Sequence, residues 1–213
     1  MRRALSAWLS AVTRRAFDVA VAATVLVLVS PVMIAALAAI RWQSRGPALF
    51  RQTREGHQGR PFAMWKLRTM YLDADRLLAE HLDRDPEARV EWLRYFRLSN
   101  DPRVLPGVGA LLRRTSLDEM PQFWNVLRGE MSVIGPRPLP IDAVGTLRPE
   151  LRALRNTVKP GITGLWQVSG RSDTDMRALE EIDATYVRSR SLSLDLDILL
   201  RTPRAVLSGR GAF

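Results

Sequence analysis

The chain has 213 residues, which is enough for one globular domain. Its 32 basic and 22 acidic residues give a formal net charge of +10, so a negatively charged partner is expected: nucleic acid, an anionic membrane surface or a phosphorylated substrate. There is no cysteine, which excludes disulfides, thiolate nucleophiles and zinc–thiolate sites, and the two histidines, His57 and His81, lie far apart in sequence, which argues against a histidine-rich metal site.

An uncharged apolar segment, residues 19–40, is the first predicted element. As a straight helix rising roughly 1.5 Å per residue, it would just cross a hydrocarbon core of about 30 Å. Ser30-Pro31 lies at its midpoint, where proline removes a helical hydrogen bond and predicts a break. Arginines flank the segment on both sides, and positively charged flanks tend to stay in the cytoplasm. Together these features predict a re-entrant helix-break-helix whose two ends lie on one face of the membrane.

Two other interpretations of this segment remain open. Transmembrane helices tolerate proline, so a kinked spanning helix fits the same residues. A signal peptide would need a cleavage site such as Ala36-Leu37-Ala38, although arginines follow that tripeptide. On the re-entrant interpretation, the chain divides into an N-terminal membrane unit, residues 1–45, and a cytoplasmic domain, residues 46–213.

The remaining chain predicts a small, mostly helical α+β domain. Two short apolar runs, residues 48–52 and 62–69, surround the turn-prone EGHQGRP and predict a β-hairpin with a longer loop. Alternation along the second strand would place Lys66 and Arg68 on one face. Amphipathic helices, some expected at the membrane interface, are predicted at residues 72–98 with a break near Asp85-Pro86, at 148–157 and at 192–207.

The stretch SLDEMPQFWNVLRGEMSVIGPRP sets two adjacent carboxylates, Asp118 and Glu119, at the start of a helical pattern. One interpretation is structural: Ser116 and Glu119 fit a capping box, in which Glu119 reaches back to the backbone N–H of Ser116. A helix from about Asp118 would hold Pro121 in its first turn and end at Gly129. Its apolar stripe would comprise Leu117, Met120, Trp124 and Leu127.

The location of Asp118 also has a chemical interpretation. A helix N-terminus favours anions, so it would keep a carboxylate ionised and draw a phosphate group toward it. An ionised aspartate can act as a covalent nucleophile toward phosphorus, and a second carboxylate beside it can hold Mg²⁺, which neutralises phosphate charge. The rigid fork of arginine suits phosphate oxygens, although any single arginine could equally be a surface charge. The candidates around this pair are Arg113, Arg114 and Arg137.

Five parts of the chain, in fixed order, carry a resemblance to a known family. They are Ser30-Pro31 within the apolar segment, SRGPALFRQTREGHQGRPFAMWKLRTM, SNDPRVLPGVGALLRRTSLDEMPQFWNVLRGEMSVIGPRP, KPGITGLWQVSGR and YVRSRSLSLDLDILLRT. Together, over roughly residues 14–208, they resemble the bacterial sugar transferases, monotopic phosphoglycosyl transferases that act on polyprenol phosphate. Leu67 departs from the family, which usually has an aromatic residue at this position.

The resemblance implies that Asp118 is the nucleophile and that Glu119 binds Mg²⁺. Asp118 would attack the β-phosphate of a UDP-sugar, release UMP and hold the phosphosugar until polyprenol (undecaprenyl) phosphate takes it, giving a polyprenol diphosphate sugar. This reaction is the first membrane step of bacterial glycoconjugate or exopolysaccharide biosynthesis. The positions at which the family would contact substrate phosphates correspond to Lys66, Arg68, Arg113, Arg137, Gln167 and Arg171.

The resemblance also implies a location at the bacterial inner membrane, with the re-entrant segment in phospholipid, the catalytic domain on the cytoplasmic face and no nucleic-acid partner. It leaves open the sugar, the pathway and whether the protein forms a homodimer. Two rival functions fit parts of the same sequence. A non-enzymatic, membrane-anchored basic module would need only the apolar segment and the positive charge. A glycosyl transferase would move the sugar without its phosphate and would release UDP.

Overall fold

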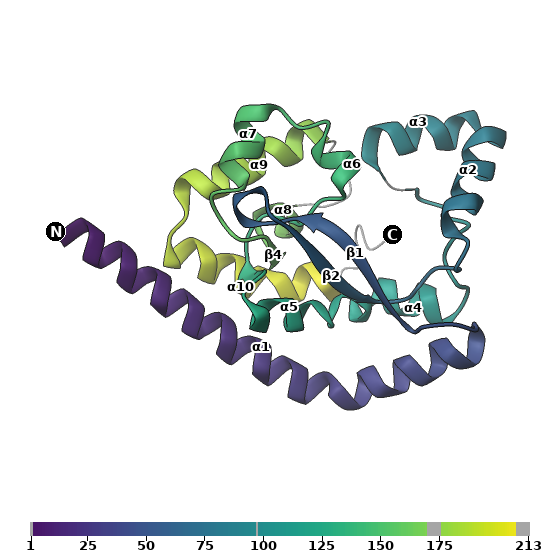
Figure 1. Cartoon of the computed structure of the whole chain (residues 1–213), viewed down its shortest axis with the longest axis horizontal. Helices are drawn as coiled ribbons and strands as arrows, with labels where there is room; N and C mark the ends of the chain where they lie inside the picture. The colour runs from purple at the N-terminus through teal and green to yellow at the C-terminus, as the bar shows by residue number, and fades with distance from the viewer. Residues whose placement is uncertain (1, 97, 170–175, 208–213) are drawn as a thin grey trace.

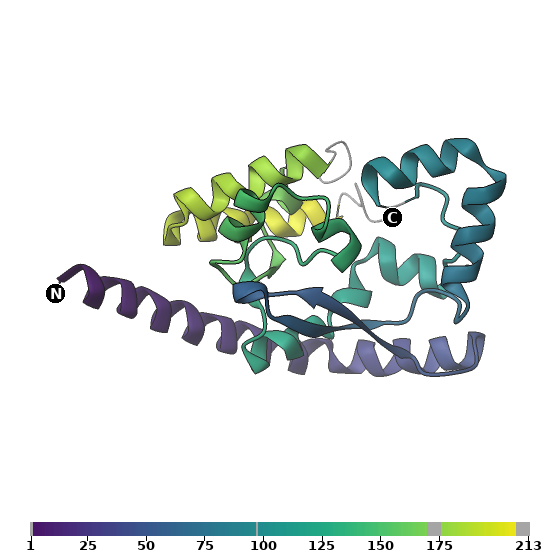
Figure 2. The same cartoon turned by 45° about the horizontal axis from the view of Figure 1, so that its top comes forward.

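A computed structural model describes residues 2–96, 98–169 and 176–207 of the chain. This described part consists of one long N-terminal helix, α1, and a small domain of shorter helices with two two-stranded sheets (Figure 1, Figure 2). The predicted mostly helical α+β class is confirmed. In chain order the elements are α1 (Arg2–Gln43), β1 (Leu49–Glu55), β2 (Pro61–Leu67), α2 (Ala74–Arg84), α3 (Pro86–Tyr95), α4 (Val108–Arg114), α5 (Gln122–Arg128), β3 (Ser132–Ile134), α6 (Ile141–Val144), α7 (Pro149–Arg155), β4 (Gly161–Thr163), α8 (Leu165–Val168), α9 (Met176–Ser189) and α10 (Leu192–Leu207).

Helix α1 carries the apolar segment and bends near its middle (Figure 1). Pro31 has no N–H to donate to the Val27 carbonyl, and the hydroxyl of Ser30 donates to that oxygen instead, at 2.8 Å. The expected break is therefore a bend within one continuous helix. Val27 and Leu28 are 72% and 71% exposed, so the bend presents an apolar surface suited to lipid. Within the described residues, α1 is the one helix long and apolar enough to cross a membrane.

Two side chains near the start of the apolar segment fasten α1 to the domain. The guanidinium of Arg15 donates to the carbonyl oxygens of Val126 and Leu127, at 2.6 and 2.7 Å, near the end of α5. The buried carboxylate of Asp18 accepts a hydrogen bond from the hydroxyl of Ser132 at 2.9 Å and one from the N–H of the next residue at 2.8 Å. Helix α1 is thus joined by buried and partly buried polar contacts to the two elements that follow the acidic pair, α5 and β3.

Strands β1 and β2 form the predicted antiparallel hairpin, with Gln52 opposite Met64 and Arg54 opposite Phe62. Phe62 and Met64 belong to the main hydrophobic core, to which α1, α5, β3, α9 and α10 also contribute. Fully burying one large apolar side chain stabilises a fold by roughly 1.5–3 kcal/mol, so this core fixes the hairpin against α5. Its buried members are Ala22, Phe62, Met64, Phe123, Val126, Met131, Val133, Ile134, Tyr186 and Ile198.

Strands β3 and β4 are parallel, with Ser132 opposite Gly161, and beyond them the chain packs in a seam of three glycines, Gly135, Gly161 and Gly164. A Cβ at Gly161 would overlap the backbone nitrogen of Gly135, and a Cβ at Gly164 would overlap the carbonyl oxygen of Gly135. Two backbones therefore lie against each other with no room for a side chain. This glycine seam holds the Gly-Pro-Arg-Pro turn, residues 135–138, beside β4.

The other predicted helices form close to their expected places. Asp85 ends α2 and caps α3, because its carboxylate accepts hydrogen bonds from the N–H groups of Glu87 and Ala88 at 2.9 and 3.0 Å. The predicted break there is confirmed. The patterns at residues 148–157 and 192–207 correspond to α7 and α10.

Candidate active site

Asp118 and Glu119 lie in a single 3₁₀ turn, Leu117–Glu119, between α4 and α5. The predicted capping box is wrong. Ser116 takes a left-handed backbone conformation with φ of 56° and its side chain makes no cap hydrogen bond, and α5 begins only at Gln122. The reason is electrostatic: the Glu119 carboxylate binds two cations from other elements, and a neutral backbone N–H is a weaker partner than either.

The predicted apolar stripe is wrong at Trp124, whereas Met120 and Leu127 pack against the main core and Leu117 packs against a second apolar cluster. Trp124 is 52% exposed, because the helix starts later than expected and follows a tighter turn. The buried face carries Gln122, Phe123, Asn125 and Val126. Asn125 ties α5 to β2 by accepting a hydrogen bond from one backbone group of the strand and donating to another. The helix ends at Gly129, which has φ of 80°, as predicted.

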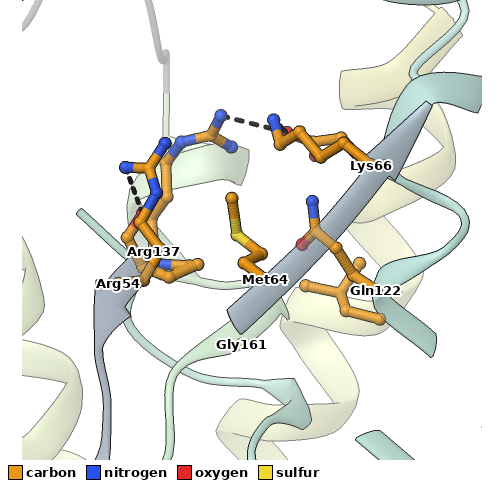
Figure 3. A pocket seen from close by; sticks show the side chains of 9 residues that line it. Arg54, Met64, Lys66, Gln122, Arg137 and Gly161 are labelled. Atoms are coloured by element: carbon orange, nitrogen blue, oxygen red, sulfur yellow. Dashed lines mark hydrogen bonds and ion pairs between the residues drawn. The ribbon is translucent and has the colours of Figure 1, made fainter. Parts of the chain in front are cut away.

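A cluster of opposite charges surrounds the acidic pair. The Nζ of Lys66, on β2, lies 2.9 Å from Oε1 of Glu119 and 3.9 Å from Oδ2 of Asp118. Nη2 of Arg137 lies 3.1 Å from the same Glu119 oxygen, reaching in from the Gly-Pro-Arg-Pro turn. Figure 3 shows Lys66 and Arg137 approaching from opposite sides of the site. The hairpin and the turn therefore meet at the two carboxylates.

Asp118 is the more deeply buried carboxylate of the pair. The pKa of its carboxyl is raised to about 6, mainly because burial destabilises a charge removed from water. Lys66 and Arg113 partly oppose this rise, and the charge of Glu119 adds to it. At neutral pH the carboxyl is still mainly ionised. Burial also lowers the pKa of the Arg113 guanidinium, and the charge of Asp118 opposes that shift. Asp118 is thus an ionised, poorly solvated carboxylate with cations close by, which is the environment of a reactive nucleophile.

A small pocket opens beside the pair (Figure 3). It is lined by Arg54, Met64, Lys66, Glu119, Gln122, Arg137, Pro138, Gly161 and Ile162. Three of these residues are cations and one is a carboxylate, so the lining favours an anionic ligand.

Arg137 is held in this pocket by its neighbours on both sides. Its carbonyl oxygen accepts a hydrogen bond at 2.6 Å from Nη2 of Arg155, which is itself ion-paired to Asp183 in the interior. Its guanidinium lies 5.9 Å from the ring of Trp166, within range of a cation–π contact. Arg137 is therefore positioned from α7 and α8 as well as from its own turn.

Arg68, another predicted site residue, lies away from the acidic pair. The prediction that Lys66 and Arg68 share a strand face is wrong, because β2 ends at Leu67. The buried guanidinium of Arg68 instead donates to the carbonyl oxygens of Ser44 and Arg45, at 2.8 and 2.9 Å, just beyond the end of α1. That guanidinium fixes the junction between α1 and the hairpin and does not reach the acidic pair.

Gln167 and Arg171 were also predicted to contact phosphate. Gln167 is buried and donates to the carbonyl oxygen of Ile162 at 3.3 Å, so it supports the strand that lines the pocket. Arg171 lies outside the described residues. The phosphate contacts of these residues stay predictions.

Arg54 and Gln122 line the pocket but were not predicted as site residues. Arg54 lies across the hairpin from Phe62, so strand alternation puts it on the same face as Met64 and Lys66. That signal is present in the sequence, but it can be used only once the register of the hairpin is known, and the long loop left the register open.

The sequence profile described as bacterial sugar transferase matches residues 9–209 of this chain. The chain is 40% identical over 200 residues to the exopolysaccharide production protein ExoY of Rhizobium meliloti, covering 94% of this chain and 88% of that protein. It is also 40% identical over 200 residues to the undecaprenyl-phosphate galactose phosphotransferase of Salmonella typhimurium, covering 94% of this chain and 41% of that protein.

A further relative is the UDP-glucose:undecaprenyl-phosphate glucose-1-phosphate transferase of Escherichia coli strain K12, 40% identical over 197 residues. That match covers 89% of this chain and 39% of the relative. The chain thus spans less than half the length of the Salmonella and Escherichia proteins and most of the length of ExoY.

Proposed function

Because the chain belongs to the bacterial sugar transferase family, we propose that it transfers a sugar 1-phosphate from a UDP-sugar to polyprenol (undecaprenyl) phosphate. The observation that carries this proposal is the buried Asp118 beside Glu119, with Lys66 and Arg137 in contact with the pair. The names of the relatives support the class of substrates, since two of them are named for sugar-phosphate transfer to undecaprenyl phosphate.

In the first step we propose that Asp118 attacks the β-phosphorus of the UDP-sugar. A bond forms between a carboxylate oxygen and phosphorus while the bond from phosphorus to the oxygen bridging the two phosphates breaks, and UMP leaves with that oxygen and its electron pair. The Nζ of Lys66 lies 3.9 Å from Oδ2 of the attacking carboxylate, so it can stabilise charge on the phosphoryl oxygens. The burial of Asp118 supports this role, because a weakly hydrated carboxylate is a better nucleophile.

In the second step a phosphate oxygen of the polyprenol phosphate attacks the same phosphorus. Its bond forms as the bond to Asp118 breaks, which returns the carboxylate and gives a polyprenol diphosphate sugar. Arg137, fixed by Arg155 and Trp166, is placed to bind phosphate oxygens in both steps without moving.

Glu119 is the residue we propose to bind Mg²⁺, with Asp118 as its neighbour. Among the described residues no three His, Cys, Asp or Glu side chains form a metal cluster. Mg²⁺ is commonly held by one or two carboxylates together with substrate phosphates, so the pair fits this ion. When bound, the ion would neutralise phosphate charge that otherwise repels the nucleophile.

We further propose that α1 is re-entrant and that the domain lies on the cytoplasmic face of the bacterial inner membrane. The bend at Pro31, the exposed apolar surface around it and the arginines at both ends support this topology. The hairpin and α5 also expose apolar rings or side chains, as at Phe50 and Trp124, that would suit a membrane interface.

The topology makes a direct labelling prediction. The chain has no cysteine, so Val12→Cys and Arg45→Cys each introduce a single thiol, one before and one after the apolar segment. Both thiols are expected to resist a membrane-impermeant maleimide in intact spheroplasts and to react in inverted membrane vesicles. Labelling of the two thiols from opposite sides would establish a spanning helix.

The proposed reaction is tested by the nucleotide that it releases. Detergent-solubilised protein is incubated with Mg²⁺, undecaprenyl phosphate and a panel of UDP-sugars, and the nucleotide product is identified. We expect UMP from one UDP-sugar, together with a lipid-linked diphosphate sugar. Release of UDP would show glycosyl transfer instead, and no release from any donor would favour the non-enzymatic basic module.

The same assay tests the role of the metal. EDTA in excess is expected to stop UMP release, because without the ion only side chains would neutralise the phosphate charge. Added Mg²⁺ should restore the release. Undiminished release in EDTA would contradict the metal-binding role of Glu119.

A further inference from the structure

Arg54 is a partly buried cation that forms no ion pair among the described residues, although the nearby charge of Glu119 raises the pKa of its guanidinium. Burial lowers the pKa of its guanidinium to about 9, and the neighbouring charge of Arg137 lowers it as well. Its Nη1 donates to the Pro138 carbonyl at 3.3 Å and its Nη2 to the side-chain oxygen of Gln52, and both acceptors are neutral. Its Nε has no hydrogen-bond partner, and none of the ion pairs among the described residues includes it.

The fold holds this cation beside a second one. The backbone of Arg54 pairs with Pro140, which ties β1 to the segment after the Gly-Pro-Arg-Pro turn. Figure 3 shows Arg54 and Arg137 together on one side of the pocket, with Lys66 and Gln122 on the other. Two adjacent guanidinium groups repel each other and lose hydration, so this arrangement is stabilised when an anion lies between or beside them.

We propose that Arg54 binds the phosphate group that is bonded to the reacting phosphorus on the side opposite Asp118. Arg137 forms an ion pair with Glu119 at 3.1 Å, whereas Arg54 lines the same pocket and, among the described residues, forms no ion pair or hydrogen bond with either carboxylate. Arg54 is thus placed for a phosphate one position farther from the nucleophile than the phosphate that Asp118 attacks.

The two-step reaction gives this site two successive occupants. In phosphoryl transfer the attacking and leaving oxygens lie roughly in line through phosphorus. UMP must therefore leave opposite Asp118, and the polyprenol phosphate must attack from the side that UMP has vacated. Arg54 first binds the phosphate of the departing UMP and then that of the lipid acceptor. This inference rests on the proposed function, since it assumes a transfer through Asp118.

Binding measurements test the site without turnover. The full chain in detergent is titrated with UMP and, separately, with a short-chain polyprenol phosphate. Hydrogen bonds to charged groups contribute enough that Arg54→Met is expected to weaken the binding of each probe by about 10- to 100-fold. Arg54→Lys keeps the charge and should recover part of the loss. The matched control is Arg51→Met, an exposed arginine on the same strand, which should change neither affinity.

The shared site adds a competition measurement. In the wild-type protein, UMP and the polyprenol phosphate should displace each other. Weakened binding of only one probe, or simultaneous binding of both, would overturn the shared site. Unchanged affinities in an Arg54→Met protein whose unfolding temperature matches the wild type would overturn the role of Arg54 alone. A wild-type protein that binds neither probe would contradict the proposed function, and the site with it.

Discussion

Asp118→Asn is expected to abolish UMP release while leaving the fold and the membrane association intact. An amide is not a nucleophile toward phosphorus, so turnover should fall by at least about 10⁴-fold, in the range seen when a covalent nucleophile is removed. Stability should not fall with it. Burial makes the ionised form of Asp118 costly in the folded state, and among the described residues its one ion pair is a long one, 3.9 Å from Oδ2 to Nζ of Lys66. The neutral amide relieves that cost.

The assay for Asp118→Asn is nucleotide release beside a trapping measurement. Protein incubated with a radiolabelled UDP-sugar and no lipid acceptor should retain label in the wild type and none in the variant. Asp142→Asn is the matched control, because Asp142 is exposed on α6 and does not line the pocket, and it should behave as wild type. Appreciable turnover by Asp118→Asn would rule out the nucleophile assignment.

Arg155→Met is expected to give the largest loss of stability. Arg155 and Asp183 form an ion pair in the interior, where their side chains are 8% and 2% exposed. Removing one partner leaves the other buried without a counter-charge, at a cost of about 3–5 kcal/mol. The same change removes the hydrogen bond to the Arg137 carbonyl, so UMP release should also slow. Chemical denaturation in detergent measures the first effect and the nucleotide assay measures the second.

The stability loss of Arg155→Met should depend on pH with a defined sign. Burial raises the pKa of Asp183 to about 6 from an ordinary 3.8 even beside Arg155, and losing Arg155 raises it further. An acid with a higher pKa in the folded state contributes less stability as pH rises from its unfolded pKa to its folded one. In the wild type this decline ends near pH 6, whereas in the variant it continues above pH 6. The deficit should therefore widen above pH 6, and a deficit independent of pH would contradict the assignment.

Arg84→Met is the matched control for this prediction. Arg84 is 80% exposed at the end of α2 and lies 3.9 Å from Glu80. Solvent screens such a pair, so its removal should change the free energy of unfolding far less than Arg155→Met does. A similar loss in both variants would show that the interior pair contributes no more to the free energy of unfolding than an exposed pair does.

Local patterns in the sequence predicted the parts of the fold that local chemistry decides. Apolar runs around a turn predicted the hairpin, the Asp85-Pro86 pair predicted the boundary between two helices, and Gly129 predicted the end of α5. Each of these features is decided by residues that lie close together in the sequence. The bend at Pro31 belongs to the same group, since it depends on one missing N–H.

The sequence could not predict contacts that depend on distant segments. Ser116 and Glu119 have the spacing of a capping box, but Lys66 and Arg137 come from elsewhere in the fold and take the Glu119 carboxylate. Arg68 has the sequence context of a site residue, yet the turn after α1 offers its guanidinium two carbonyl oxygens. In each case tertiary partners override the local pattern.

The sequence predicted Asp118 and Glu119 as the acidic pair of the site, but it predicted only part of their surroundings. The sequence and the family resemblance together predicted that Lys66, Arg113 and Arg137 belong to the site, and in the structure these cations lie around the pair. Arg54 was overlooked because its side depends on the register of a hairpin with a long loop. Of the two lining residues that were not predicted, Arg54 depends on strand pairing, and Gln122 depends on where α5 begins.

At the glycine seam the pocket is lined by closely packed backbone, whereas elsewhere it is lined by side chains. A side chain at Gly135, Gly161 or Gly164 would push two backbones apart, so these positions tolerate no exchange without moving the Arg137 turn. The rest of the lining, which includes Met64, Lys66 and Gln122, consists of side chains, and a substitution there would change the lining without forcing two backbones apart. A substitution in the seam would therefore act on the site through the backbone, by moving the Arg137 turn, whereas a substitution among the lining side chains would act on the site directly.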